Sequence, residues 1–374
     1  MSWEKGLLKN ISVVDWGNTD LTKKSFSEDG EFLGVSAAGV DGKMNHYEHE
    51  YGTLVISAIG ANCGKLFFPS GRFTAIKNTI TITPKRNLVH PKYLFYYLND
   101  NDFRRRGAGQ PFISKGDTEL IEIPLPPLPI QQKIAAILDQ ADALRKKDQQ
   151  LLAKYDELLQ AVFYDMFGDP VKNEKGWEKL NGDEYSEKIS VGVVIQPASY
   201  YVEKGVIALR SLNIRPNKIV LENLVHFSEE ANKNQLHKSI LKENDVVIVR
   251  TGATGTAAVV PKELDGCNCI DLIIVRPDKN IINSIYLSLF FNSDFGKNIV
   301  SGKEVGGIQK HFNIGAIKSL KIPIPPIKIQ TRFAIIVKNI QQQKEQVKQQ
   351  TEHSENLFQS LLQRAFKGEL VKKN

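Results

Sequence analysis

The chain has 374 residues, of which 41% are hydrophobic, and carries a formal net charge of +7. This length suggests two or three domains, and no apolar run approaches the roughly 18 residues that a membrane span needs. The first ten residues, MSWEKGLLKN, lack a long apolar core, so we expect no secretory signal there. Three cysteines, an odd number, argue against a disulfide scaffold and for the reducing cytoplasm. The positive charge permits a polyanionic partner without naming one.

A mixed α/β segment comes first along the chain. Short apolar runs at 54–60 (LVISAIG) and 79–83 (TITIT) predict strands, and KLFF lies between them. The run at 90–107 (HPKYLFYYLNDNDFRRRG) predicts a helix, with its aromatic side chains packed in the core. A glycine-rich loop, GAGQPFISKGD, follows at 107–117.

A proline-rich hinge, IEIPLPPLPIQQ at 121–132, then leads into a long helix. No proline or glycine occurs from Ile130 to Phe167, which predicts a helix about 57 Å long. Pro129 suits its first turn and Gly168 its C-terminal cap. Apolar residues at three- and four-residue spacing, interrupted by Asp148, predict a helix-pairing seam. The seam residues are Ile137, Ala141, Leu144, Leu151, Tyr155, Leu158 and Val162.

The same order of elements then recurs. The strand-like runs DVVIVRTG and DLIIVRP precede a helix-like run at 283–300, a loop at 301–315 and a second hinge, LKIPIPPIKIQT. Ile123 of the first hinge matches Ile322 of the second, 199 positions later, and WEKG at Trp3 is echoed by WEKL at Trp177. The predicted seam of the second long helix is Ile336, Ile340, Val347, Leu357 and Leu361. Two similar mixed α/β domains therefore alternate with two long helices that pair with each other, an α+β fold.

The repeat predicts four segments. They are a first domain at 1–122, a hinge and helix at 123–170, a second domain at 171–321, and a second hinge and helix at 322–374.

The sequence contains no obvious catalytic constellation. The run Gly60 to Lys65 resembles a phosphate-binding loop but has three residues between its glycines rather than four. Cys267 and Cys269 have no further cysteine or histidine pair at zinc spacing, so we expect no metal site. We therefore expect the chain itself to be non-catalytic and to need no cofactor.

Two binding domains joined by paired helices would be held at a fixed distance from each other, and would contact two sites on a partner at that spacing. Sites one turn apart on duplex DNA are separated by about 34 Å, which helices about 57 Å long could span. The domains differ in sequence while the hinges agree, which suits an asymmetric target in two parts.

The order of domain, I-P-x-P-P hinge with a following glutamine, and long helix, twice over, resembles the specificity subunits of type I restriction–modification systems. The resemblance covers the whole chain. Two departures occur in the second copy, where Thr331 replaces Gln132 and Lys328 replaces Pro129. The resemblance implies that each domain is a target recognition domain reading one half of a bipartite DNA site. It also implies that the helices pack as an antiparallel coiled coil with pseudo-two-fold symmetry.

The partners are implied in the same way. They are double-stranded DNA, two methyltransferase subunits that modify adenine with S-adenosylmethionine, and restriction subunits that use ATP and magnesium; no membrane is involved. Two alternatives stay open: a scaffold whose domains bind protein rather than DNA, and an enzyme with unusual motifs.

Candidate DNA-binding residues lie on the glycine-containing turns and loops, where arginine, lysine, glutamine and asparagine can reach phosphates or base edges. In the first domain they are Ser57, Asn62, Lys65, Arg104, Arg105, Arg106, Gln110 and Lys115. In the second they are Arg210, Arg250, Thr251, Thr254, Lys303, Gln309, Lys310 and His311, with Asn213 and Arg215 beside Arg210. The alternatives are a solvated helix end for the three arginines, an ordinary tight turn for the glycines, and a salt bridge within the domain for Arg250.

Overall fold

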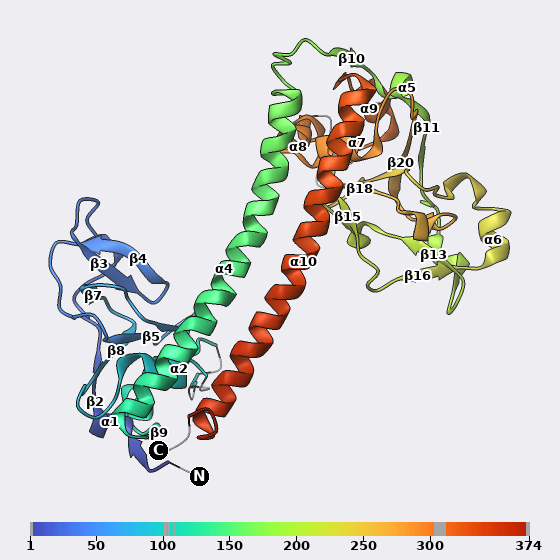
Figure 1. Ribbon diagram of the computed structural model, residues 1–374. Helices are drawn as coiled ribbons and strands as arrows, with labels where there is room; N and C mark the ends of the chain where they lie inside the picture. Colours follow the sequence, from blue (N-terminus) through green and yellow to red (C-terminus); the bar gives the residue numbers. More distant parts are fainter. Residues whose placement is uncertain (1–2, 101–102, 104, 108, 303–311, 372–374) are drawn as a thin grey trace. The chain divides into compact units, whose positions relative to one another are not determined.

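The computed structural model describes residues 3–100, 103, 105–107, 109–302 and 312–371. The chain divides into two compact units (Figure 1), Met1–Gln150 with Lys348–Asn374, and Leu151–Val347. Each unit contains one mixed α/β domain and half of each long helix. No helix among the described residues is long and apolar enough to span a membrane.

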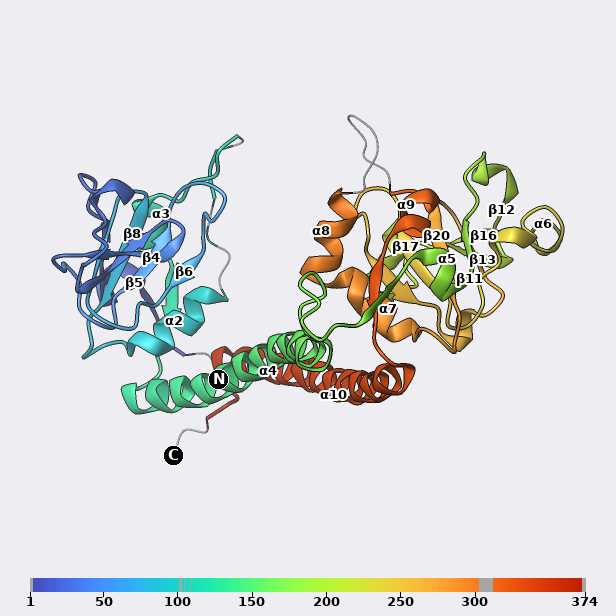
Figure 2. The ribbon, with the colours of Figure 1, turned by 90° about the horizontal axis from the view of Figure 1, so that it is seen from above.

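In unit 1 the domain has two sheets. The first is antiparallel, in the order β2 (Ser12–Trp16), β8 (Thr79–Pro84), β5 (Leu54–Ser57) and β6 (Leu66–Phe67). The second has the order β4 (Gly39–Met44), β3 (Phe32–Ser36) and β7 (Phe73–Ala75). The shorter elements are β1 (Lys5–Leu7), α1 (Leu8–Ile11), α3 (Lys115–Glu119) and β9 (Glu122–Pro124). Helix α2 (Pro91–Asn99) lies beside the long helix α4 (Figure 2), and Tyr96 donates a hydrogen bond to Asp139 of α4 at 2.6 Å.

Unit 2 repeats this architecture with extra strands. Its first sheet has the order β11 (Ser186–Val191), β20 (Leu272–Pro277), β17 (Val246–Val249) and β18 (Ala257–Val259). Its second sheet has the order β12 (Tyr201–Val202), β16 (Val225–Phe227), β13 (Val206–Leu209) and β19 (Asn268–Cys269), beside a hairpin of β14 (Ile214–Arg215) and β15 (Lys218–Ile219). The remaining elements are β10 (Glu178–Leu180), α5 (Gly182–Tyr185), α6 (Glu229–Lys233), α7 (Ser284–Asn292), α8 (Asp294–Gly302), α9 (Ile314–Ser319) and β21 (Ile322–Ile324).

The two domains share the same strand pairings. The central sheets match in the order in which their strands pair, β2-β8-β5-β6 against β11-β20-β17-β18. The strands at the two WEK segments, β1 and β10, pair with the hinge strands β9 and β21 in the same register in both domains. Lys5 lies opposite Pro124, and Lys179 lies opposite Pro323. The domain helices α2 and α7 also bury the predicted aromatic residues Tyr96, Phe290 and Phe291, while Phe95 is partly buried against the core. The repeat predicted from the sequence is therefore present in three dimensions.

A buried glutamine fastens each hinge to its domain. Gln131 Nε2 donates to the carbonyl oxygens of Pro126 and Leu88, at 2.8 and 3.1 Å, and its Oε1 accepts from the His90 amide at 2.8 Å. Gln330 makes the same three hydrogen bonds with Pro325, Ile281 and Asn283. Both side chains are buried.

A buried tyrosine makes a second matching contact to each hinge. Tyr93 Oη donates to the Pro124 carbonyl oxygen at 2.8 Å, and Tyr286 Oη donates to the Pro323 carbonyl oxygen at 2.7 Å. The glutamine and tyrosine together set the direction in which each long helix leaves its domain.

The long helices are α4 (Leu128–Phe167) and α10 (Ile327–Phe366), and they run antiparallel (Figure 1). In unit 1 Arg145 pairs with Glu355 at 3.2 Å, while Asp148 accepts from Gln350 at 3.2 Å. In unit 2 Asp156 pairs with Lys344. The helix α4 begins two residues before the expected start, so Pro129 lies in its first turn, as predicted. Gly168 follows it with a φ of 75°, and its amide donates to the Tyr164 carbonyl oxygen, the expected glycine cap.

The predicted seam needs correction. Leu144, Leu151, Leu158 and Leu357 are 38–48% exposed, so they lie outside the buried contact between the helices. The buried positions are shifted along the helix, and they are Ile134, Leu138, Ala141, Asp148, Phe163, Phe333, Val337, Ile340, Val347, Ser354, Phe358 and Leu362. Ala141, Ile340 and Val347 were predicted correctly, and Ile137, Tyr155, Val162, Ile336 and Leu361 are partly buried. The seam was misplaced because Asp148, Arg145 and Ser354 pack inside it, where a purely apolar pattern has no place for them.

Candidate nucleic-acid interface

A tight turn follows β5 in unit 1 and presents polar side chains. Gly60 and Gly64 adopt φ values of 91° and 92°, a region that disfavours residues with a Cβ. The Gly64 amide donates to the Ser57 carbonyl oxygen at 2.9 Å, closing the turn. Asn62 and Lys65 are exposed on it. Ser57 is fully buried, so its prediction as a DNA contact is wrong, because the last residue of β5 points into the core.

The glycine-rich loop meets this turn. The Ile113 amide donates to the Ala58 carbonyl oxygen at 2.8 Å, and the Gly60 amide donates to the Pro111 carbonyl oxygen at 3.1 Å. A Cβ on Gly64 would lie 3.1 Å from a terminal nitrogen of Arg105, so the guanidinium lies against the turn. The structure thus brings two separately predicted groups together on one surface, which we call the unit 1 face: Asn62, Lys65, Arg105 and Gln110. The loop lies on the side of unit 1 away from α4 (Figure 2).

Two other predicted cations of unit 1 are held by carboxylates. Arg106 makes a two-point salt bridge with Asp117 at 2.6 and 2.7 Å. Lys115 donates to Asp15 at 3.0 Å, and this hydrogen bond lowers the pKa of the Asp15 carboxyl. Both cations therefore stabilise the loop. Arg104 lies outside the described residues.

The equivalent turn of unit 2 is built in the same way. The Gly255 amide donates to the Val249 carbonyl oxygen at 2.9 Å, and Arg250 follows β17. Arg250 Nη1 lies 2.9 Å from Asp271 Oδ1, and Thr251 donates to the other oxygen of Asp271 at 3.3 Å. The salt bridge considered as the alternative for Arg250 is therefore present. Its side chain is still 24% exposed, and Thr254 is partly exposed nearby.

In unit 2, Phe312 contacts the same turn. The Phe312 amide donates to the Arg250 carbonyl oxygen at 3.2 Å, as Ile113 does to Ala58 in unit 1. The predicted residues Lys303, Gln309, Lys310 and His311 lie outside the described residues.

The predicted group around Arg210 has a structural role. Asn213 is fully buried and donates to the carbonyl oxygens of Val220 and Glu222 at 3.1 and 2.8 Å. Arg210 donates to the Asn223 carbonyl oxygen, while Arg215 is exposed and donates to its neighbour Ile214. These contacts hold the segment around the β14–β15 hairpin in place.

A polar cavity beside the unit 1 face was missed by the sequence reasoning. It encloses about 300 Å³ and is lined by Asn62, Asn78, Lys23 and Lys77, among others. These residues come from three separate segments, the turn after β5 (Asn62), the short 3-10 helix that contains Lys23, and the two residues before β8 (Lys77 and Asn78), and no local motif predicts that they meet. The one available signal was the asparagine before strand β8, because asparagine tolerates the left-handed φ of 69° found there.

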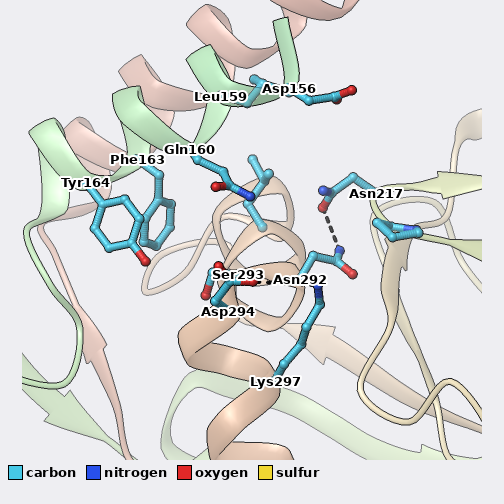
Figure 3. Close-up of a pocket in the computed structure, with 12 residues that line it drawn as sticks. Asp156, Leu159, Gln160, Phe163, Tyr164, Asn217, Asn292, Ser293, Asp294 and Lys297 are labelled. Carbon is cyan, nitrogen blue, oxygen red and sulfur yellow. Dashed lines mark hydrogen bonds and ion pairs between the residues drawn. The ribbon is translucent and has the colours of Figure 1, made fainter. Parts of the chain in front are cut away.

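A second cavity, in unit 2, has a different character. It encloses about 350 Å³ between the second half of α4 and helices α7 and α8 (Figure 3), and Phe163, Tyr164, Asn292 and Lys297 contribute to its lining. Its carboxylates, Asp156 and Asp294, are paired with Lys344 and Lys297. The acidic side chains of this cavity are therefore neutralised by neighbouring lysines.

The cysteines show no metal site. Cys267 and Cys269 are buried, and burial raises the pKa of Cys267 to about 12, which keeps the thiol protonated. Within the described ranges, no group of three or more histidine, cysteine, aspartate or glutamate residues could hold a metal ion.

The fold defines a tandem-repeat protein in which two similar mixed α/β domains alternate with two long paired helices. The sequence matches the family of type I restriction modification DNA specificity domains over residues 2–154 and 217–353. This match covers more than half of the chain, so the chain belongs to that family. It is a specificity subunit of a type I restriction–modification system.

Individual relatives agree with this assignment. The chain is 25% identical over 337 residues to the type I restriction enzyme MjaVIII specificity subunit of Methanocaldococcus jannaschii, covering 84% of this chain and 78% of that protein. Its fold is similar to the crystal structure of the specificity subunit from M. genitalium, with a TM-score of 0.64, 16% identity and coverage of 98% and 96% of the two chains. A chain from a structural study of complex assembly in the type I system gives a TM-score of 0.58, at 18% identity and 99% and 98% coverage.

Proposed function

We propose that this specificity subunit reads an asymmetric, two-part sequence in double-stranded DNA, one half with each domain. The observation that carries the proposal is the repeated face. In each domain one backbone hydrogen bond closes the glycine-containing turn, Gly64 to Ser57 and Gly255 to Val249, and a second joins the turn to a later residue, Ile113 or Phe312. The side chains on the two turns nevertheless differ. A common frame with different polar groups is what reading two different half-sites requires.

The proposed function includes the partner subunits that this chain would bind and the reactions that they would catalyse. Two methyltransferase subunits would bind the chain and transfer the methyl group of S-adenosylmethionine to an adenine. Restriction subunits that use ATP and magnesium would join them. The chain itself would position the complex and carry out no bond-making step. The support is the family assignment and the related chain from a study of type I complex assembly.

Long-read methylation sequencing of host DNA, with the gene intact and deleted, tests this function. The expected result is an asymmetric two-part adenine motif that is methylated only when the gene is present. If methylation is unchanged by the deletion, and no methyltransferase co-purifies with the chain, the proposal is wrong.

DNA binding also separates this proposal from a purely protein-binding scaffold. Contacts to several phosphates would make the affinity of the assembled complex for DNA fall steeply as the salt concentration rises. An affinity for DNA that does not change with salt concentration would favour the protein-binding scaffold.

A further inference from the structure

The central sheets of the two domains end at matching positions. The last pair of the β5–β8 ladder is Ser57 with Thr79, and the last pair of the β17–β20 ladder is Val249 with Leu272. One step beyond these pairs lie Asn78 in unit 1, and Arg250 and Asp271 in unit 2. Asn78 and Asp271 occupy the same place before β8 and β20.

The backbone at this place is the same in both domains. Asn78 has a φ of 69° and Asp271 a φ of 50°, a left-handed conformation that few residues other than glycine adopt. Both residues directly precede the central strand of their sheet. The sheet therefore fixes the backbone there and leaves the side chain to differ.

The side chains at this place offer different hydrogen bonds. Asn78 is exposed and lines the polar cavity, and its amide has no hydrogen-bond partner in the part of unit 1 that the structure describes. In unit 2 Asp271 instead holds Arg250 through one terminal nitrogen at 2.9 Å. The other guanidinium N–H groups have no partner within the described ranges, and the side chain is partly exposed.

These two arrangements match different bases. An asparagine amide pairs with the N6 and N7 edge of adenine, and an arginine guanidinium pairs with O6 and N7 of guanine. We propose that the position before the central strand distinguishes the half-sites: Asn78 reads an adenine in one, and Arg250, positioned by Asp271, reads a guanine in the other. This inference rests on the proposed function and adds to it the residues that read bases and the bases they read.

The surroundings of Asn78 support a DNA contact. Lys77 is exposed and lines the same cavity, whereas Lys23, which also lines it, is paired with Asp41. An exposed lysine can contact a phosphate and fix the register of a protein on the duplex. Asp271 acts through Arg250 and is a positioning residue, because its two oxygens are engaged by Arg250 and Thr251.

The test uses the full chain, returned to the gene-deleted host as Asn78→Gly, Arg250→Ala or Asp271→Gly, with methylation read at every near-match to the motif. Glycine keeps the left-handed backbone without strain. Asn78→Gly should lower discrimination at one adenine of one half-site by roughly 5- to 150-fold, the range for a two-point base contact, and leave the other half-site intact. Arg250→Ala should do the same at a guanine of the other half-site.

Two comparisons make the test specific. Asn244→Gly is the matched control, because Asn244 is also exposed with a φ of 70° but precedes the opposite end of β17. It should leave the motif unchanged. Asp271→Gly should weaken discrimination at the guanine that Arg250 reads, and have no further effect when Arg250 is already alanine. A purely structural role would instead lower methylation uniformly.

The outcomes separate the inference from the function it rests on. If the unaltered chain directs no motif, the proposed function fails and this inference with it. If the motif is present but neither Asn78→Gly nor Arg250→Ala changes base preference, or if one substitution relaxes both half-sites, this inference alone is wrong.

Discussion

The hinge glutamines offer a direct test of how each long helix is fastened to its domain. Gln131→Ala removes three hydrogen bonds at once and leaves the His90 amide and two carbonyl oxygens without their partner. Leaving a buried polar group unpaired costs about 1–3 kcal/mol, and water that enters the vacated space would offset part of this cost for the three groups. We therefore expect the free energy of local unfolding to fall by about 3 kcal/mol in total. Amides around His90 should then exchange with solvent about 100-fold faster.

The assay is hydrogen exchange measured by mass spectrometry on the full chain, since it resolves the two units without assuming that they unfold together. Gln132→Ala is the matched control, because Gln132 is the next residue, of the same type, and exposed. Gln330→Ala should produce the same change around Asn283 in unit 2. Equal exchange near His90 in Gln131→Ala and Gln132→Ala would refute the reasoning.

Three further predictions follow from contacts described above. His90→Asn should stabilise unit 1 by about 1 kcal/mol, because Asn283 caps α7 with its side chain at the equivalent position, whereas the His90 side chain does not cap α2. Burial also lowers the pKa of His90. The unaltered protein should therefore lose stability as the pH falls below the ordinary histidine pKa of about 6.5, and the variant should lose less. Leu138→Ala, in the buried seam, should cost about 2–5 kcal/mol in urea unfolding, whereas Leu144→Ala, on the exposed side, should cost less than about 1 kcal/mol; equal costs would contradict the revised seam. Lys115→Met should raise the pKa of Asp15 toward its ordinary value in a carboxyl NMR titration, because the Lys115 hydrogen bond that lowers this pKa is lost. In the unaltered protein, this hydrogen bond contributes to stability above the ordinary aspartate pKa, and the contribution disappears as the pH falls through the pKa of Asp15 in the folded state.

The repeat could be predicted from the sequence because detecting it requires only a comparison of one part of the chain with another. The hinges, the long helices and the turns of the two domains were placed correctly, since proline, glycine and apolar spacing act locally. The seam was misplaced because Arg145 stacks on Phe358, with the guanidinium 4.4 Å from the ring centroid, and so fills a position that apolar spacing would leave to leucine. Such a contact depends on the partner helix, more than 200 residues away in the chain.

The candidate recognition surface was only partly predictable for a similar reason. Asn62 and Arg105 were predicted as DNA contacts because each lies in a local motif, and the structure places them on one surface. Asn78 and Asp271 were not predicted, because the role that we propose for them depends on the strand ladder that each one precedes. Ser57 was wrongly included, since strand alternation near a turn does not reveal which face is buried.

The division of the chain has a consequence for its synthesis on the ribosome. Unit 2 is one continuous stretch, Leu151–Val347, whereas unit 1 includes Lys348–Asn374, and Phe358, Leu362 and Ala365 belong to the core of unit 1. The domain translated first therefore cannot complete its core until nearly the whole chain has left the exit tunnel. The domain translated second can close earlier. Once the residues up to Val347 have left the tunnel, the nascent chain should hold a folded second domain and an unfinished first one, the reverse of the usual order in which domains fold during translation.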